Sequence, residues 1–213
     1  MKMTNSLGML LIVILLGGCA SLRISSEFQS GRTALLTGKT EVALSYFASV
    51  AAQDPNYSYG TAYRQGVLGY LGRAEYVSGQ LSQAQKTLER AVALNREDDS
   101  ARLYLGLALA RSGDRQRGLG EIESGMKGIH GFLEWVTQTH RFSFGQFWDP
   151  TRQIRSAIER DLAMMRSNEI DWPRLIADAE WLGKEIDEEG DRARYDEIRE
   201  RKSESEGGSN SHP

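Results

Sequence analysis

The sequence predicts an all-α fold of stacked helical hairpins. Three observations predict it: a repeated spacing, glycines at regular turn positions, and apolar residues at helical intervals further along the chain. Four residues of a central unit recur in the same order, with Leu71, Gly72, Ala74 and Gly79 followed by Leu105, Gly106, Ala108 and Gly113. The step is 34 residues in each case (105 − 71, for example). A constant period of this length is typical of two-helix units. One unit cannot bury its own apolar face, so we expect neighbouring units to stack.

The central unit is predicted to form a helix, a turn and a second helix. Gly79 is placed at the turn, because a residue without a Cβ takes a positive φ at little cost. The second helix carries an apolar face spaced by four and three residues, formed by Ala84, Leu88 and Ala91. Ser82 and Gln85 have the spacing of a capping box, which predicts that this helix begins at Ser82.

The spacing resembles the tetratricopeptide repeat. In that family a Leu-Gly pair, a turn glycine and small residues between large ones recur at fixed positions. The central unit matches with Leu68, Leu71, Gly72, Glu75, Gly79, Ala84, Leu88 and Ala91. The third unit matches more loosely with Arg102, Leu105, Gly106, Leu109, Gly113, Gly118, Ile122 and Gly125. An upstream unit matches with Gly31, Ala34, Gly38, Ala43, Phe47, Val50 and Pro55.

The resemblance covers residues 24–132 and implies a solenoid of about three repeats over residues 27–128, with C-terminal helices packed against it. The step from Gly38 to Gly79 is 41 residues (79 − 38), which predicts about two extra helical turns between the first two units. An unrelated helical bundle with a chance period is the alternative.

The N-terminus has the features of a targeting segment. Lys2 precedes an apolar run over residues 7–16 that is too short to span a bilayer comfortably. The run ends in Leu16, Gly17, Gly18 and Cys19, which resembles the lipobox of bacterial lipoproteins. The resemblance implies a signal peptide over residues 1–18, lipidation of Cys19, and a lipidated tether over residues 19–26. The alternative is an ordinary signal peptide with an incidental cysteine.

Composition and charge narrow the location and the partners. Cys19 is the only cysteine, so a lipidated chain has no thiol for a disulfide or a metal. Ala20, rather than Asp, follows it. For a Gram-negative source the lipoprotein resemblance therefore implies the outer membrane, facing the periplasm. The net charge of −3 and the lack of a polybasic stretch argue against a nucleic-acid partner.

The repeat resemblance also implies a partner-binding groove, because the first helices of such units line a concave face. In this register the groove carries Arg32, Arg73, Tyr76, Leu107 and Arg111. A guanidinium group suits carboxylates. We therefore expect a protein segment with an acidic residue or a C-terminal carboxylate. The alternative is that the arginines are solvated, or paired with Glu75 and Asp114.

The C-terminal third, residues 129–202, is predicted to be helical. Residues 129–136 have an amphipathic pattern that predicts a helix capping the repeats. Asp149-Pro150 and Asp171 are placed at helix starts, Gly190 at a possible helix break, and residues 203–213 in a disordered tail. Between these helices lies an aromatic loop with Phe142, Phe144, Phe147 and Trp148. This loop either fills a gap in the fold or forms a second partner patch.

The sequence contains no motif that predicts catalysis, a metal site or a cofactor. His130 and His140 lack a third ligand at metal-binding spacing. We therefore expect a non-enzymatic, membrane-anchored adaptor that binds a protein of the bacterial envelope. Two other hypotheses stay open: a homo-oligomeric structural lipoprotein, and a small hydrolase-like module that uses acidic residues of the C-terminal third.

Overall fold

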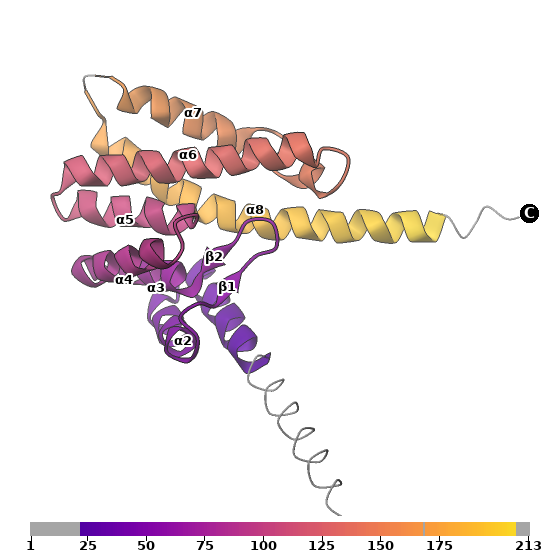
Figure 1. Cartoon of the computed structure of the whole chain (residues 1–213), viewed down its shortest axis with the longest axis horizontal. Helices are drawn as coiled ribbons and strands as arrows, with labels where there is room; N and C mark the ends of the chain where they lie inside the picture. Colours follow the sequence, from indigo (N-terminus) through magenta and orange to yellow (C-terminus); the bar gives the residue numbers. More distant parts are fainter. Residues whose placement is uncertain (1–21, 168, 208–213) are drawn as a thin grey trace, which may run out of the picture.

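The computed structural model describes residues 22–167 and 169–207, and the predicted signal peptide and Cys19 lie outside this part of the chain. The all-α prediction is confirmed. The first helix covers residues 22–36, and the elements after it are α2 (Thr40–Gln53), β1 (Ser58–Tyr59), β2 (Gln65–Gly66), α3 (Val67–Val77), α4 (Leu81–Leu94), α5 (Asp99–Arg111), α6 (Arg115–Thr139), the 3-10 helix η1 (Phe144–Phe147), α7 (Gln153–Met165) and α8 (Trp172–Gly207). Successive helices from α2 to α6 pack against each other (Figure 1).

The predicted turn glycines and small contact residues lie where the spacing places them. Gly38, Gly79 and Gly113 have φ angles of 74°, 76° and 99°, and each separates two packed helices. A Cβ on Gly72 would lie 2.4 Å from Leu88 Cγ, so the glycine allows α3 and α4 to approach closely. At the equivalent position of the next pair, a Cβ on Gly106 would lie 2.5 Å from the backbone nitrogen of Ile122. The repeated glycine of the Leu-Gly pair is therefore required for this close helix packing.

The extra residues between the first two units form a β-hairpin and not the predicted helical turns. Strand β1 pairs antiparallel with β2 in the register Ser58 to Gly66 and Tyr59 to Gln65. Helix α2 ends at Gln53, just before Pro55, and Gly60 has a φ of 104° at the hairpin bend. Proline cannot donate a helical hydrogen bond and this glycine conformation is not helical, so the helix does not continue.

Three predicted boundaries lie inside helices, and the third, between residues 202 and 203, falls within α8. The boundary between residues 128 and 129 falls within α6, because one fully buried stripe of Ile122, Met126, Ile129, Leu133 and Val136 continues across it. The expected capping helix is thus the second half of α6. At the N-terminus, residues 22–26 of the predicted tether are already helical.

Three helix starts test the capping predictions. Helix α4 begins at Leu81 after the turn at Gly79, and Gln80 at its N-cap makes no side-chain cap bond, so the predicted capping box at Ser82 is wrong. Asp149 does not start α7 directly, because it has a φ of 42° and the helix begins at Gln153. Its carboxylate nevertheless accepts the Ile154 N–H at 2.9 Å. The start at Asp171 is confirmed by a bond of 3.2 Å from the Arg174 N–H.

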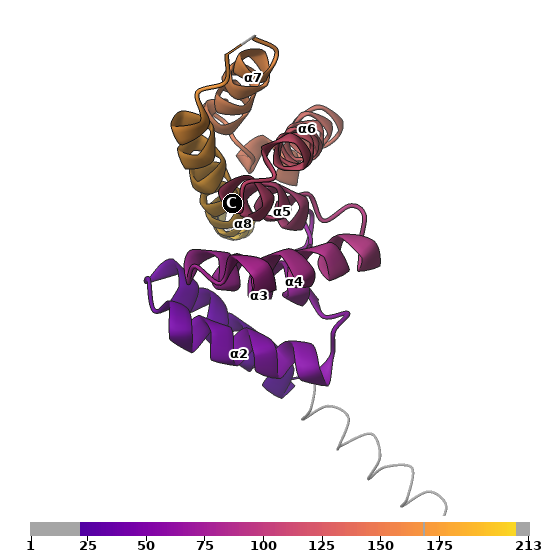
Figure 2. The same cartoon turned by 90° about the vertical axis from the view of Figure 1, so that its left-hand side faces the viewer.

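Helix α8 runs unbroken through Gly190, so the predicted break there is wrong. Gly190 packs under Trp148, and the buried residues Ile186 and Ala193 continue the apolar face on both sides of it. The helix also includes residues 203–207 of the predicted disordered tail. Figures 1 and 2 show that the first part of α8 crosses the molecule beside α5, while its C-terminal part projects away from the other helices. None of the helices described here is both long enough and apolar enough to span a bilayer.

Candidate functional site

The predicted groove residues lie on one face, and α8 of the same chain covers it. We define this groove face by Arg32 of the first helix, Arg73 and Tyr76 of α3, and Arg111 of α5. All four side chains bond to acidic residues of α8. The fifth predicted residue, Leu107, is fully buried in the core and is not accessible to a partner in this structure.

The centre of the groove face is a buried charge cluster. Asp187 of α8 bonds to Arg32 at 2.7 Å, to Arg73 at 3.3 Å, and to the Tyr70 hydroxyl at 2.6 Å. Arg32, Arg73 and Asp187 are all at most 6% exposed. Burial acts to lower the pKa of Arg32, but Tyr70, Asp187 and Asp191 outweigh it and raise the pKa above its ordinary value. The pKa of Arg73 is raised as well, so both guanidinium groups stay charged. The cluster joins α8 to the first helix and to α3.

The end of the groove face near α3 and α5 is more open. Arg111 pairs with Glu180 of α8 at 2.6 Å, and the Tyr76 hydroxyl donates to the same carboxylate. Arg111 also lies over the Tyr76 ring, 4.9 Å from its centroid. A cavity of about 380 Å³ remains beside these residues and reaches Val77, which is 54% exposed. We call it the groove opening.

The alternative ion-pair partners are not used. Glu75 is buried, which raises its pKa, and its Oε2 atom has no hydrogen-bond partner. Asp114 caps α6 by accepting the Arg117 N–H at 3.2 Å. The arginines are paired, as that hypothesis allowed, but with acidic residues of α8. The sequence signal for this was the spacing of Glu180, Asp187 and Asp191 along one helix, which the sequence analysis missed.

The aromatic loop mostly fills the fold. Trp148 is buried and meets Phe132 edge to face with ring centroids 4.9 Å apart. Phe144 stacks on His140, and both Phe144 and Phe147 are partly buried against the core. Only Phe142 is open, at 84% exposure. A four-residue aromatic patch is therefore not available on the surface.

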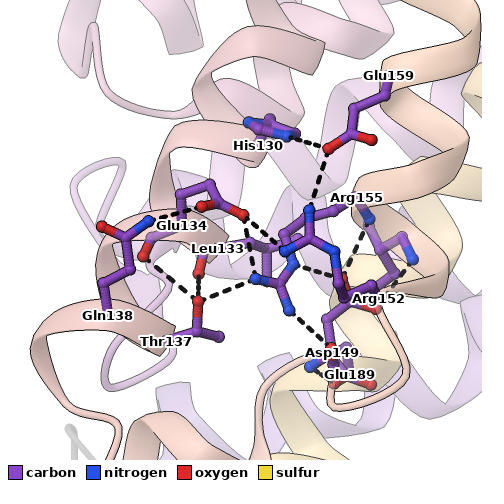
Figure 3. A network of polar contacts seen from close by, with 11 residues as sticks. His130, Leu133, Glu134, Thr137, Gln138, Asp149, Arg152, Arg155, Glu159 and Glu189 are labelled. Carbon is purple, nitrogen blue, oxygen red and sulfur yellow. Dashed lines mark hydrogen bonds and ion pairs between the residues drawn. The ribbon is translucent and has the colours of Figure 1, made fainter.

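A polar network that the sequence analysis missed joins α6, α7 and α8 (Figure 3). Arg155 is 5% exposed and bonds to Asp149 at 2.9 Å, to Glu134 at 3.1 Å and to Thr137 at 3.0 Å. Glu189 of α8 accepts the Asp149 N–H. The only sequence signal for this network was the position of Arg155, three residues before Ile158 on the buried face of α7. Because arginine and backbone groups occupy these carboxylates, the network favours a structural role over acid–base chemistry.

Histidine and metal chemistry add no further site. His130 Nε2 lies 3.2 Å from Glu159. Across the part of the chain that the structure describes, no group of three or more His, Cys, Asp or Glu residues could hold a metal ion.

No protein-family model matches the sequence, and no curated protein matches it either. Functional inference therefore depends on the geometry.

Proposed function

We propose that this protein is a lipid-anchored adaptor of the bacterial envelope, in which a tetratricopeptide-type array binds a protein partner. The observation that carries the proposal is the groove face itself, where Arg32, Arg73 and Arg111 bond to acidic residues of a helix. The predicted chemistry of recognition, guanidinium to carboxylate, is thus used within the chain. A face that accommodates one acidic helix is suited to a partner with similar chemistry.

The partner is expected to bind where it can most easily replace a contact between α8 and the groove face. Displacing α8 at Asp187 would leave two buried arginines without their carboxylate, which is strongly unfavourable. Glu180 is different, because its side chain is 35% exposed and Arg111 is 43% exposed. We therefore place partner contact at the groove opening, where a carboxylate can reach Arg111 beside the exposed Val77.

The anchor would fix the position of the array. Lipidation of Cys19 would place the acyl chains three positions before residue 22 (22 − 19), which is already in the first helix. Dual acylation suffices for stable attachment to a bilayer. The repeat helices would therefore be held close to the membrane surface, and the outer membrane facing the periplasm is the location that Ala20 favours.

In-cell photo-crosslinking tests the adaptor function. A photoreactive amino acid at Val77 should capture a defined envelope protein, while one at Val42, which is 47% exposed, serves as the matched surface control. Arg111→Glu should abolish the crosslink, and Arg117→Glu on an exposed ion pair should not. Cys19→Ser should move the protein from the membrane fraction to the soluble fraction. Identical captured proteins at both positions, or capture unaffected by Arg111→Glu, would contradict the proposal.

Self-association is a second candidate because large apolar side chains outside the groove face are exposed. Tyr195 is 67% exposed and Ile198 is 62% exposed in the second half of α8, and Phe142 is open on the aromatic loop. A second copy could cover these side chains. Light scattering over a range of protein concentrations would show a rising molar mass if it does, and Ile198→Ser should then restore the monomer.

A further inference from the structure

A second cavity takes no part in the groove contacts. It has a volume of about 820 Å³ and lies between the β1–β2 hairpin, the α4–α5 connection and α6. Asp98 and Asp99 line one wall, and Phe132 and Trp135 of α6 line another. No groove-face residue lines it. We call it the acidic cavity.

Local contacts keep the acidic cavity open. Asp98 accepts the Gly66 N–H at 2.7 Å and the Ala101 N–H at 2.9 Å, which fixes the hairpin to the start of α5. A Cβ on Gly128 would lie 2.0 Å from Asp99 Oδ1, so the carboxylate occupies space that this glycine leaves. At Gly131 a Cβ would meet no atom within 4 Å. Two glycines of α6 thus allow room for the carboxylate and for a ligand.

Among the described residues, the carboxylates of the acidic cavity have cations near them but none in direct contact: Arg64 lines the cavity, and the charge of Arg102 acts to lower the pKa of Asp99. Within the described chain, no cation lies within 4.0 Å of Asp98 or Asp99. Arg102 pairs instead with Glu121 at 3.2 Å, and Arg64, which lines the cavity, donates to Ser58. Burial raises the pKa of Asp98 to about 6. Burial and then the charge of Asp98 raise the pKa of Asp99 to about 7. A bound cation would relieve this repulsion.

Aromatic side chains form a surface beside these carboxylates. Tyr63 and Phe132 have ring centroids 4.9 Å apart, and those of Phe132 and Trp135 are 6.2 Å apart. Trp135 is 50% exposed, although the buried stripe of α6 runs beside it. Aromatic faces attract cations, and a carboxylate next to such a face favours an ammonium or guanidinium group over a neutral one.

We propose that the acidic cavity binds a lysine or arginine side chain presented by an extended segment of a protein partner. Asp99 accepts the cation, and Phe132 and Trp135 pack against its aliphatic stem. Asn56 and Asn95 at the rim carry amides, which can both donate to and accept from the backbone of the segment. The inference rests on the proposed adaptor function and adds a second contact with the partner. The groove opening takes a carboxylate, whereas the acidic cavity takes a cation.

The test uses the full chain with Cys19→Ser and two matched peptides. One is a seven-residue peptide with three lysines, and the other is the same peptide with all three lysines acetylated. The fluorescence of Trp135, isolated by subtraction of the Trp135→Phe signal, reports binding. The lysine peptide should bind, the acetylated one should not, and binding should weaken as salt is added.

Two variants locate the binding. Asp99→Asn removes the carboxylate that accepts the cation. It should weaken binding about tenfold, which corresponds to about 1.4 kcal/mol. Gly131→Leu should block the cavity without harming the fold, because its Cβ enters open space. Asp114→Asn is the matched control, since it also removes an acidic residue near a helix start but lies outside the cavity.

Several outcomes would overturn the inference. These are equal binding of the acetylated peptide, binding unaffected by Asp99→Asn or Gly131→Leu, or spermidine binding as tightly as the peptide. Spermidine would point to a free small cation and not to a protein segment. The result is separable from the adaptor test: a Val77 crosslink without peptide binding removes only this inference, and peptide binding without a Val77 crosslink removes only the groove contact.

Discussion

On the groove face, Asp187 meets two arginines of its own chain, whereas Asp98 and Asp99 at the acidic cavity meet no cation within 4.0 Å in the described residues. Both regions bury carboxylates next to tyrosine rings, so the residue types alone do not separate them. The difference is whether the fold itself supplies the opposite charge. Where an arginine contacts the carboxylate, the charges hold helices together. Where none does, burial raises the carboxyl pKa values. There the proposed cationic ligand supplies the missing contact.

The largest effect should come from breaking the paired region. Asp187→Ala would leave Arg32 and Arg73 buried without their shared carboxylate and should lower the free energy of unfolding by about 3–5 kcal/mol. Urea denaturation followed by circular dichroism measures it. Glu123→Ala, which removes an exposed pair with Lys127, is the control and should change stability by less than about 1 kcal/mol. A loss of similar size in both variants would mean that the cluster at Asp187 is not special.

The second prediction uses pH to separate the two regions. The pKa of Asp99 is raised to about 7 and that of Asp98 to about 6, so the folded state takes up protons before the unfolded state does. Stability should therefore rise by about 2 kcal/mol as pH falls from about 8 to about 6. On the groove face, burial acts to raise the pKa of Asp191, but Arg32 lowers it overall. That contribution is present above the ordinary carboxyl pKa and is lost only as pH falls well below about 4.

Urea midpoints across this pH range measure the effect, and Asp99→Asn should remove most of the rise, because Asp99 has the higher pKa of the two. Asp161 of α7, whose pKa burial and then Asp178 raise to about 6, contributes in the same direction. The contribution of Asp99 is therefore obtained by comparing the pH profiles of the unmodified chain and Asp99→Asn. A profile that is flat from about pH 8 to about pH 6 in the unmodified chain would mean that the carboxylates at the acidic cavity are better solvated than their burial implies.

The sequence predicts the helix pairs better than it predicts the two charged regions. The turn glycines and the Leu-Gly contacts follow from local geometry, which a 34-residue spacing reports directly. The pairing of Arg32 with Asp187 joins residues 155 positions apart, and nothing local encodes it. The same holds for the acidic cavity, whose walls come from a hairpin inserted between units and from α6. Local rules also failed where packing overrode them, as at Gly190, which stays helical under Trp148.

The third prediction tests the open wall of the acidic cavity. Gly131→Ala adds a methyl group in empty space on a helix and should raise stability by about 1 kcal/mol, because alanine is the better helix former. Gly128→Ala should not, since its Cβ would collide with the Asp99 carboxylate. Thermal unfolding of the two variants gives the comparison. Equal stabilisation by Gly131→Ala and Gly128→Ala would show that the Asp99 side chain moves to another position at no cost, so that it does not form a fixed wall of the cavity.

The smallest effect should come from the exposed end of the groove face. Arg111→Ala removes an ion pair with Glu180 that is more than a third exposed, together with a contact over the Tyr76 ring. The expected loss is about 0.5 kcal/mol, and salt should reduce it further. A double-mutant cycle with Glu180→Ala isolates the pair from the Tyr76 hydroxyl, which bonds to the same carboxylate. A coupling energy near that of a buried pair would mean that Glu180 belongs with Asp187 to a fixed contact. The groove opening would then be closed to a competing carboxylate, and the partner would have to bind elsewhere.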